Sequence, residues 1–113
     1  MDGKLQVKYK IWLDSEGKAF GEGPRELLLL VEETGSLRQA AQQMQMSYSM
    51  AHKLINQMED RLGIPLIERT IGGPGGGGSR LTDQAHKLLA AYDAFMDETR
   101  IAIDDLFRQH FPD

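Results

Sequence analysis

The sequence predicts a mainly α-helical fold with a small β component, and three observations lead to this fold class. Apolar residues alternate with polar ones near the N-terminus, from Leu5 to Leu13. A glycine-rich stretch, Gly72 to Gly78, separates two short segments that suit β-strands. Apolar residues recur every three or four positions in four further segments, which span residues 24–34, 36–44, 47–62 and 82–110. The length of 113 residues suits a single domain with one modest core.

Composition excludes several kinds of protein. The chain has no cysteine, which excludes a disulfide scaffold, a thiolate zinc site and a cysteine nucleophile. Its longest apolar run, Leu27 to Val31, is too short to span a bilayer, and the N-terminus lacks the apolar core of a signal peptide. No paired carboxylates, Ser/His/Asp set or closely spaced histidines indicate catalysis or metal binding. We therefore expect a cytoplasmic protein without membrane contact, which is not an enzyme and needs no metal or cofactor.

Charge is distributed unevenly along the chain, although the whole molecule carries a net charge of −4. Residues 36–87 carry six basic and four acidic side chains, whereas residues 88–113 carry two basic and six acidic ones. A partner senses the field within about one Debye length, roughly 8 Å at physiological salt, rather than the total charge. The middle of the chain is therefore the segment best suited to an anionic partner such as DNA.

The N-terminal third predicts a hairpin followed by a helix. The alternating segment Leu5 to Leu13 is typical of a half-buried strand, Asp14 to Gly17 forms a turn, and Lys18 to Phe20 can return as a second strand. Pro24 suits the first position of a helix, where its missing N–H costs nothing. Gly35 can end that helix in a left-handed cap.

Residues 36–62 predict two helices joined by a tight turn. Ser36 and Gln39 form a capping box, in which the Ser36 side chain caps the first helix and the Gln39 side chain reaches back. Ser47 can cap the second helix, which ends at Gly63. Such a pair is a helix-turn-helix, whose second helix can lie in the major groove of DNA while the first helix braces it.

Close crossing of the two helices requires small residues at their contact, and the sequence supplies them. Ala41 lies on the first helix and Ala51 on the second, where Leu54 and Met58 share its apolar face. A glycine is common in the turn of this motif, but Gln45 occupies that position here. This departure from the usual motif affects the expected backbone conformation of the turn, and the apolar pattern of the two helices is unchanged.

The face of the second helix opposite these apolar residues carries hydrogen-bonding side chains. Lysine and arginine can bind guanine, asparagine can bind adenine, and hydroxyl groups or a helix N-terminus can bind phosphate. The alternative is an ordinary solvated helix face. The candidate DNA contacts, together with those of the neighbouring elements, are Ser36, Arg38, Ser47, Tyr48, Ser49, His52, Lys53, Asn56, Arg69 and Arg80.

The segment after the second helix predicts a β-hairpin, or wing, over residues 65–82. The glycines form its tip, which can approach the DNA backbone, and Arg69 and Arg80 lie at its base as phosphate ligands. Gly73 to Gly78 also match the dinucleotide-binding pattern G-x-G-x-x-G. We reject that function because Arg80 and Leu81 separate the glycines from the next helix. A connector without any contact to DNA is the remaining alternative.

The last helix, capped by Thr82 or Asp83 and reaching about His110, carries a long apolar stripe. A small domain cannot cover its whole length, so a second copy of the chain is the natural partner. The alternative is that the helix folds back on its own domain. The candidate dimer-interface residues are Leu88, Tyr92, Phe95, Met96, Ile103, Leu106 and Phe107.

Several of these motifs together resemble the N-terminal domain of the molybdate-dependent transcriptional regulators, the ModE family. The glycine-rich wing with its flanking Pro-Leu and Leu-Thr pairs is the most specific part, since LysR-type regulators share the helix-turn-helix. The resemblance spans about residues 5–95. It is carried by Gly21 to Pro24, Gly35 to Leu37 with Ala40 and Ala41, Met46 to Tyr48, Pro65 to Arg69, Gly72 to Gly78, and Leu81 with Thr82.

The resemblance implies a dimeric winged helix-turn-helix that regulates transcription from an inverted-repeat operator. Full-length members of that family also carry C-terminal oxyanion-binding domains that sense molybdate, and no part of this chain resembles them. We therefore expect one domain over residues 1–113, with the helix-turn-helix at 36–62, the wing at 65–82 and the dimerisation helix at 82–110. A winged-helix module that binds proteins without binding DNA is the alternative from another class. A small nucleotide-binding enzyme is a weaker alternative.

Overall fold

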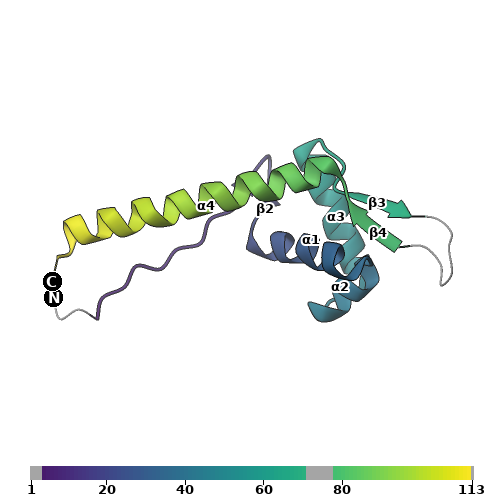
Figure 1. Ribbon diagram of the computed structural model, residues 1–113, viewed down its shortest axis with the longest axis horizontal. Coiled ribbons are helices and arrows are strands. Elements are labelled where there is room, and N and C mark those ends of the chain that lie inside the picture. The colour runs from purple at the N-terminus through teal and green to yellow at the C-terminus, as the bar shows by residue number, and fades with distance from the viewer. Residues whose placement is uncertain (1–3, 71–77, 113) are drawn as a thin grey trace.

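The computed structural model describes residues 4–70 and 78–112, and Figure 1 shows their arrangement. Within these residues the fold has four helices and two strand pairs, as the sequence predicts. The elements in chain order are β1 (Leu13–Asp14), β2 (Lys18–Phe20), α1 (Glu22–Thr34), α2 (Leu37–Gln43), α3 (Tyr48–Leu62), β3 (Ile67–Thr70), β4 (Gly78–Leu81) and α4 (Asp83–His110). None of the helices in this part of the chain is both long and apolar enough to cross a membrane.

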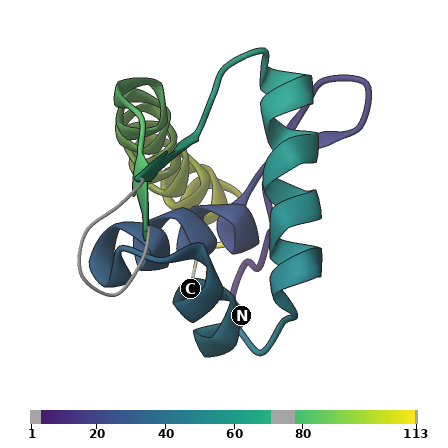
Figure 2. The same ribbon diagram turned by 90° about the vertical axis from the view of Figure 1, so that its right-hand side faces the viewer.

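The core lies where α1, α2 and α3 meet the first part of α4. Figure 2 shows α3 standing across α1 and α2, with α4 receding behind them. The largest side chains in the core include Phe20, Leu27, Met58, Leu66 and Tyr92, each at most 2% exposed. Burial of one such side chain contributes roughly 1.5–3 kcal/mol, so this shared core holds the helix-turn-helix to α4.

The first residue of α1 and one hydrogen bond at the start of α2 differ from the sequence prediction. Helix α1 starts two residues before Pro24, because Gly21 is the N-cap and Pro24 occupies the third helical position. Proline is tolerated there because the first-turn N–H groups have no partner within the helix. The Ser36 hydroxyl accepts a hydrogen bond from the backbone N–H of Gln39 (3.1 Å), as predicted. The reciprocal bond does not come from Gln39, since the Thr34 hydroxyl accepts from the Ser36 N–H (3.2 Å) instead.

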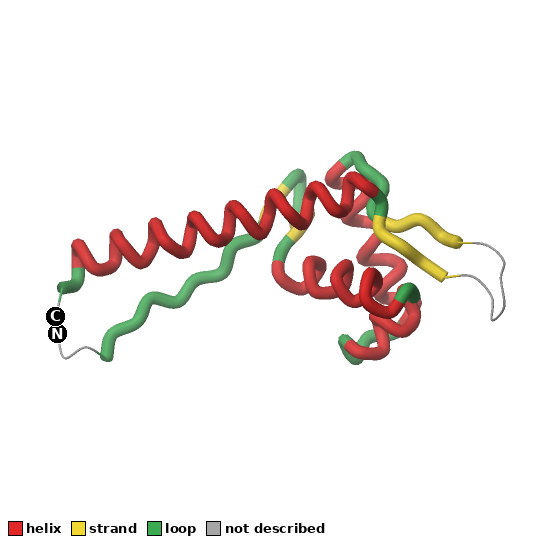
Figure 3. The backbone as a smooth tube through the Cα atoms, in the orientation of Figure 1, coloured by secondary structure: helices red, strands yellow, loops and turns green. Residues whose placement is uncertain are grey.

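The predicted N-terminal strand from Leu5 to Leu13 is wrong over most of its length. Only Leu13 and Asp14 pair with β2, while residues 4–12 form neither helix nor strand. Figure 3 shows this segment as an extended loop that runs toward the core, opposite in chain direction to α4. Leu5 and Tyr9 are 49% and 41% exposed. Alternation of apolar residues gives a strand only when a neighbouring strand satisfies the backbone, and no strand among the described residues lies beside residues 4–12.

The predicted hairpin between α3 and α4 is confirmed in its two strands. Strands β3 and β4 are antiparallel, with Glu68 opposite Arg80 and Arg69 opposite Ser79. Gly78 is required at the start of β4, because an added Cβ would lie 2.7 Å from the carbonyl oxygen of Gly35. The predicted glycine-rich tip, and with it most of the rejected dinucleotide pattern, lies at residues 71–77, outside the described residues.

Helix α4 extends far beyond the core. Its 28 residues correspond to about 42 Å at a rise of about 1.5 Å per residue. The described chain measures 60 × 27 × 21 Å, and its radius of gyration of 17.7 Å exceeds the value of about 13 Å expected for a compact chain of this size. The distal half of α4 therefore packs against no core formed by the described residues.

Tyr92 corrects one part of the predicted dimer interface. It is 2% exposed, its ring packs edge-on against Phe20 with ring centroids 5.1 Å apart, and its hydroxyl donates to the carbonyl of Ile11 (3.2 Å). Burial raises the pKa of the Tyr92 hydroxyl, which keeps it a neutral donor. Tyr92 thus belongs to the core of its own chain and offers almost no surface to a partner. Leu88 and Met96 are partly buried against the same core.

Thr82 joins the wing to α4, and its loss should destabilise both. Its buried hydroxyl donates to the carbonyl of Pro65 (2.7 Å) and accepts from the N–H of Ala85 (3.0 Å) as the N-cap of α4. We expect Thr82→Ala to lower the free energy of unfolding by about 1–3 kcal/mol, because a cap is lost and a carbonyl loses its donor. Denaturant unfolding measures this loss. Thr82→Ser, which keeps the hydroxyl, should recover most of it, and equal losses in both variants would contradict the role of the hydroxyl.

Candidate nucleic-acid interface

The turn between α2 and α3 holds the two helices at close range. Ala41 and Ala51 are at most 1% exposed, so the helix backbones approach each other as the small residues predict. The carbonyl of Ala41 accepts a bond from the N–H of Met46 (3.0 Å) across the turn. Gln45 adopts a left-handed backbone with φ of 58°, the conformation that a glycine would have supplied more cheaply. The motif therefore keeps its geometry at the cost of some backbone strain in Gln45.

Helix α3 presents two different faces. Ala51, Ile55 and Met58 are at most 4% exposed and pack into the core. Lys53 and Asn56 on the other side are exposed, and His52 beside them is half-buried. The exposed face thus carries the polar side chains that the sequence assigns to DNA, including Ser49 at its start.

The polar side chains of this face are already organised in the free protein. The Arg38 guanidinium of α2 lies 4.3 Å from the centre of the Tyr48 ring, which in turn lies 5.9 Å from the His52 ring. The His52 Nδ1 and the Asn56 amide nitrogen are 3.3 Å apart, within hydrogen-bond distance. A row of four side chains from two helices therefore forms one polar array, in which each member limits the rotamers of the next.

Two of the three predicted serines of this surface, Ser36 and Ser47, act as helix caps. The Ser36 hydroxyl caps α2, and the Ser47 hydroxyl accepts from the N–H of Met50 (3.0 Å) at the start of α3. In each case the hydroxyl oxygen is the acceptor, so its own O–H remains a donor for a phosphate oxygen. Capping and phosphate binding are therefore compatible at both residues.

The two wing arginines lie on opposite faces of the hairpin, which the sequence did not indicate. Arg69 lines a shallow depression of about 70 Å³ together with His52 and Asn56, so it adjoins the polar array of α3. Arg80 points to the other face, where its Nε donates to Glu68 (2.9 Å). Neighbours directly opposite in an antiparallel pair share a face, which explains the Glu68–Arg80 contact and separates it from Arg69.

Glu59 positions the wing relative to α3 and was missed by the sequence analysis. Its Oε2 accepts bonds from the backbone N–H groups of Leu66 (2.7 Å) and Ile67 (3.4 Å). On the other strand, the N–H of Ser79 donates to the carbonyl of Gly35 (2.8 Å). These contacts hold the base of the wing beside the exposed face of α3. No local pattern signals them, since each joins residues of different elements.

The different surroundings of the two arginines predict different effects on DNA binding. We expect Arg69→Ala to weaken binding to all DNA sequences alike and to reduce the salt slope by about one unit, because a phosphate contact is lost. Arg80→Ala should have a smaller effect, since Arg80 must first leave Glu68. Glu68→Gln, which frees Arg80, should strengthen binding slightly. Titrations at several salt concentrations test this, and a loss confined to one base position would point instead to base reading.

These elements together define a winged helix-turn-helix domain. Its second motif helix exposes a polar face, and a two-stranded wing stands beside that face. The chain belongs to the bacterial regulatory helix-turn-helix proteins of the lysR family, which match residues 26–86. Members of this class are DNA-binding transcriptional regulators and not enzymes.

Two curated relatives confirm the resemblance to the ModE family. The chain is 36% identical over 95 residues to the molybdenum transport protein ModE of Azotobacter vinelandii, covering 83% of this chain and 35% of that protein. It is 34% identical over 104 residues to the DNA-binding transcriptional dual regulator ModE of Escherichia coli K12, covering 90% of this chain and 39% of that protein. The chain thus spans little more than a third of the length of these relatives.

A solved structure confirms the fold independently. The protein chain in the crystal structure of the CbnR_DBD–DNA complex superposes on this chain with a TM-score of 0.55. The superposition covers 76% of this chain and 93% of the CbnR_DBD chain. Its sequence identity of 21% makes this a likeness of fold alone.

Proposed function

We propose that this chain binds double-stranded DNA sequence-specifically, as a homodimer on an inverted-repeat operator, and thereby controls transcription in the bacterial cytoplasm. One observation carries this proposal. Arg38 of α2 forms an ordered polar array with Tyr48, His52 and Asn56 of α3, and Arg69 of the wing lies beside it. Such an array offers base-reading groups from a helix and phosphate-binding groups around it.

The distal half of α4 supports the homodimer. Phe95 is 49% exposed and Leu106 is 53% exposed, while Ile103 and Phe107 between and beyond them are half-buried. These four residues lie within about one third of the helix circumference, because a helix turns once in about 3.6 residues. With Tyr92 in the protomer's own core, they are the part of the predicted interface that remains free to pack against a second copy.

Paired domains would relate the two α3 helices by a two-fold axis. Their separation on DNA is then about one helical turn, roughly 34 Å, or a multiple of it. The relative from Escherichia coli is itself described as a DNA-binding transcriptional dual regulator, which agrees with this kind of function. We further propose that DNA binding by this chain needs no metal or cofactor, so that neither a chelator nor added molybdate should change its DNA affinity.

Selection of bound DNA from a random pool tests the proposed function directly. An inverted repeat with a defined half-site spacing is the expected result, and affinity for it should fall steeply with salt. The alternative, a winged-helix module that binds only proteins, draws some support from the net charge of −4. That alternative predicts no enriched sequence and no salt-dependent binding to any DNA.

A further inference from the structure

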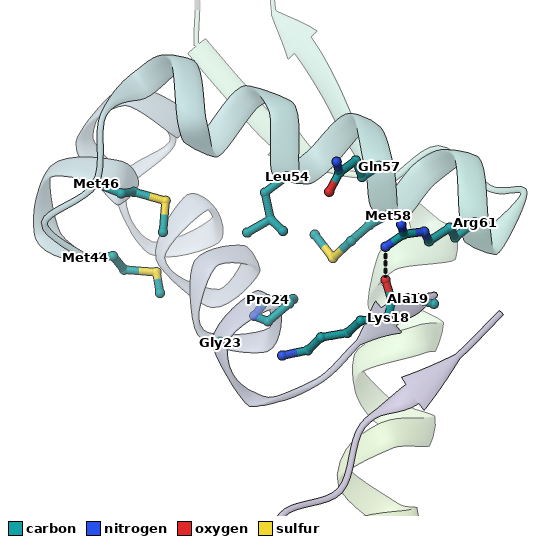
Figure 4. A pocket seen from close by; sticks show the side chains of 10 residues that line it. All are labelled: Lys18, Ala19, Gly23, Pro24, Met44, Met46, Leu54, Gln57, Met58 and Arg61. Carbon is teal, nitrogen blue, oxygen red and sulfur yellow. Dashed lines mark hydrogen bonds between the residues drawn. The ribbon is translucent and has the colours of Figure 1, made fainter. Parts of the chain in front are cut away.

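A cavity of about 260 Å³ lies on the side of the helix-turn-helix away from the polar array. It is bounded by β2, the start of α1, the turn between α2 and α3, and the inner side of α3. Figure 4 shows the side chains from these four elements pointing toward one hollow. Its volume is slightly below the range of about 300–1,000 Å³ that is usual for ligand pockets, which suits a small ligand.

The lining of this cavity is mostly apolar and adaptable. Met58 at its base is 1% exposed, while Met44, Met46 and Leu54 are partly buried around it. Methionine side chains are unbranched and polarisable, so they adjust to ligands of different outline. The cavity therefore favours a flat or branched hydrocarbon group.

Two cations line the cavity at different places. Arg61 donates through Nη1 to the backbone carbonyl of Lys18 (2.6 Å), whereas the Lys18 side chain extends away from that bond toward Gly23 and Pro24 (Figure 4). The Lys18 ammonium lies 5.9 Å from the centre of the Trp12 ring. Within residues 4–70 and 78–112, neither cation forms an ion pair with a carboxylate. An anionic group on a ligand could therefore pair with the Lys18 ammonium.

We propose that this cavity binds a small aliphatic or aromatic monocarboxylate. Its hydrocarbon part packs among the methionines, and its carboxylate faces the Lys18 ammonium. Lys53 and Asn56 lie on the other side of α3, so this ligand and DNA do not compete for the same surface. The ligand would contact the turn between α2 and α3 at Met44 and Met46. Because this turn sets the position of α3, a ligand bound there could act as an effector of α3. The proposal does not depend on DNA binding.

Methionine methyl NMR on the whole chain, without DNA, tests the site. We use 3-phenylpropanoate as the probe and 3-phenylpropanamide as its uncharged counterpart. The acid should shift the methyl signals of Met44, Met46 and Met58 with a dissociation constant on the order of 1 mM, typical for a ligand of this size. Met50 on the exposed face and Met96 on α4 serve as internal controls and should not move.

Charge and cavity space can then be tested separately. Loss of one exposed cation, as in Lys18→Gln, should weaken binding about threefold, and the amide should bind about tenfold more weakly than the acid. Gly23 lines the cavity, and a Cβ added there meets nothing within 4 Å. Gly23→Leu should therefore fill the space and abolish the shifts. Because a side chain before Pro24 disfavours the helical backbone, denaturant unfolding must show that this variant still folds.

Three results would overturn the proposal. The first is absence of shifts at Met44, Met46 and Met58. The second is equal binding of the acid and the amide, or equal shifts at Met50 and Met96, which would indicate non-specific apolar contact. The third is occupation of the cavity by a macromolecule. Methionine methyl shifts that depend on protein concentration would indicate that a second copy of the chain fills it. Shifts that only an acidic amphipathic peptide causes would indicate a docking groove for another protein.

Discussion

Replacing Phe95 and Leu106 together by glutamate is expected to convert a dimer into a monomer. It should also weaken binding to an inverted-repeat site by about 100-fold or more, because each half-site is then bound independently. Both side chains are about half exposed in the protomer, so their replacement leaves its core intact. In a dimer each glutamate would bring an unpaired charge into an apolar interface, beside the native Asp104 and Asp105. Sedimentation at micromolar concentration and DNA titration measure the two effects.

A charge-matched variant controls for the added acidity. Ala94 and Ile101 are exposed on the opposite side of α4, and Ile101 is 58% exposed. Ala94→Glu with Ile101→Glu adds the same charge to the same helix and should leave a dimer that binds DNA nearly as before. If the parent chain is monomeric at micromolar concentration and still binds a single unrepeated site tightly, both the interface and the operator symmetry are wrong.

Lys53→Ala and Asn56→Ala are each expected to reduce specific DNA affinity by about 10-fold to 100-fold, the effect of losing about 1–3 kcal/mol of base contact. Asn56→Ala should also relax the sequence preference, because Asn56 contacts His52 (3.3 Å) and its loss frees the histidine ring. Competition binding with operator variants separates lost affinity from lost preference.

Gln57→Ala supplies the control on the same helix. Gln57 is exposed but lines the cavity on the inner side of α3, so its loss should not affect DNA binding. If Lys53→Ala and Asn56→Ala leave both affinity and sequence preference unchanged, the assignment of this face to DNA fails. Equal losses in all three variants would indicate a general disturbance of α3.

Local chemistry determined where the helices begin and end. Ser36, Ser47 and Thr82 cap helices as predicted, and Gly35 and Gly63 end them with φ near 70°. These features depend on residues within one helical turn, so a single sequence contains the information. The polar face of α3 was predictable for the same reason, because the apolar positions of a helix imply the opposite side.

Features that join distant segments were decided only by the tertiary structure. Apolar alternation from Leu5 to Leu13 produced a strand only at Leu13, because a strand needs hydrogen-bond partners and the described residues place none beside the rest of this segment. Tyr92 belongs to the apolar stripe of α4, but contacts with Phe20 and Ile11 place it in the core.

The arrangement of the wing arginines and the cavity also depend on the tertiary structure. Arg69 and Arg80 look equivalent in the sequence, and the register of β3 against β4 turns them to opposite faces. The cavity beside Met58 combines residues from four elements, whose meeting no local pattern encodes. Helix caps and helix faces arise from interactions within a few residues, whereas strand pairing, burial and cavities depend on which surfaces meet when the chain closes on itself.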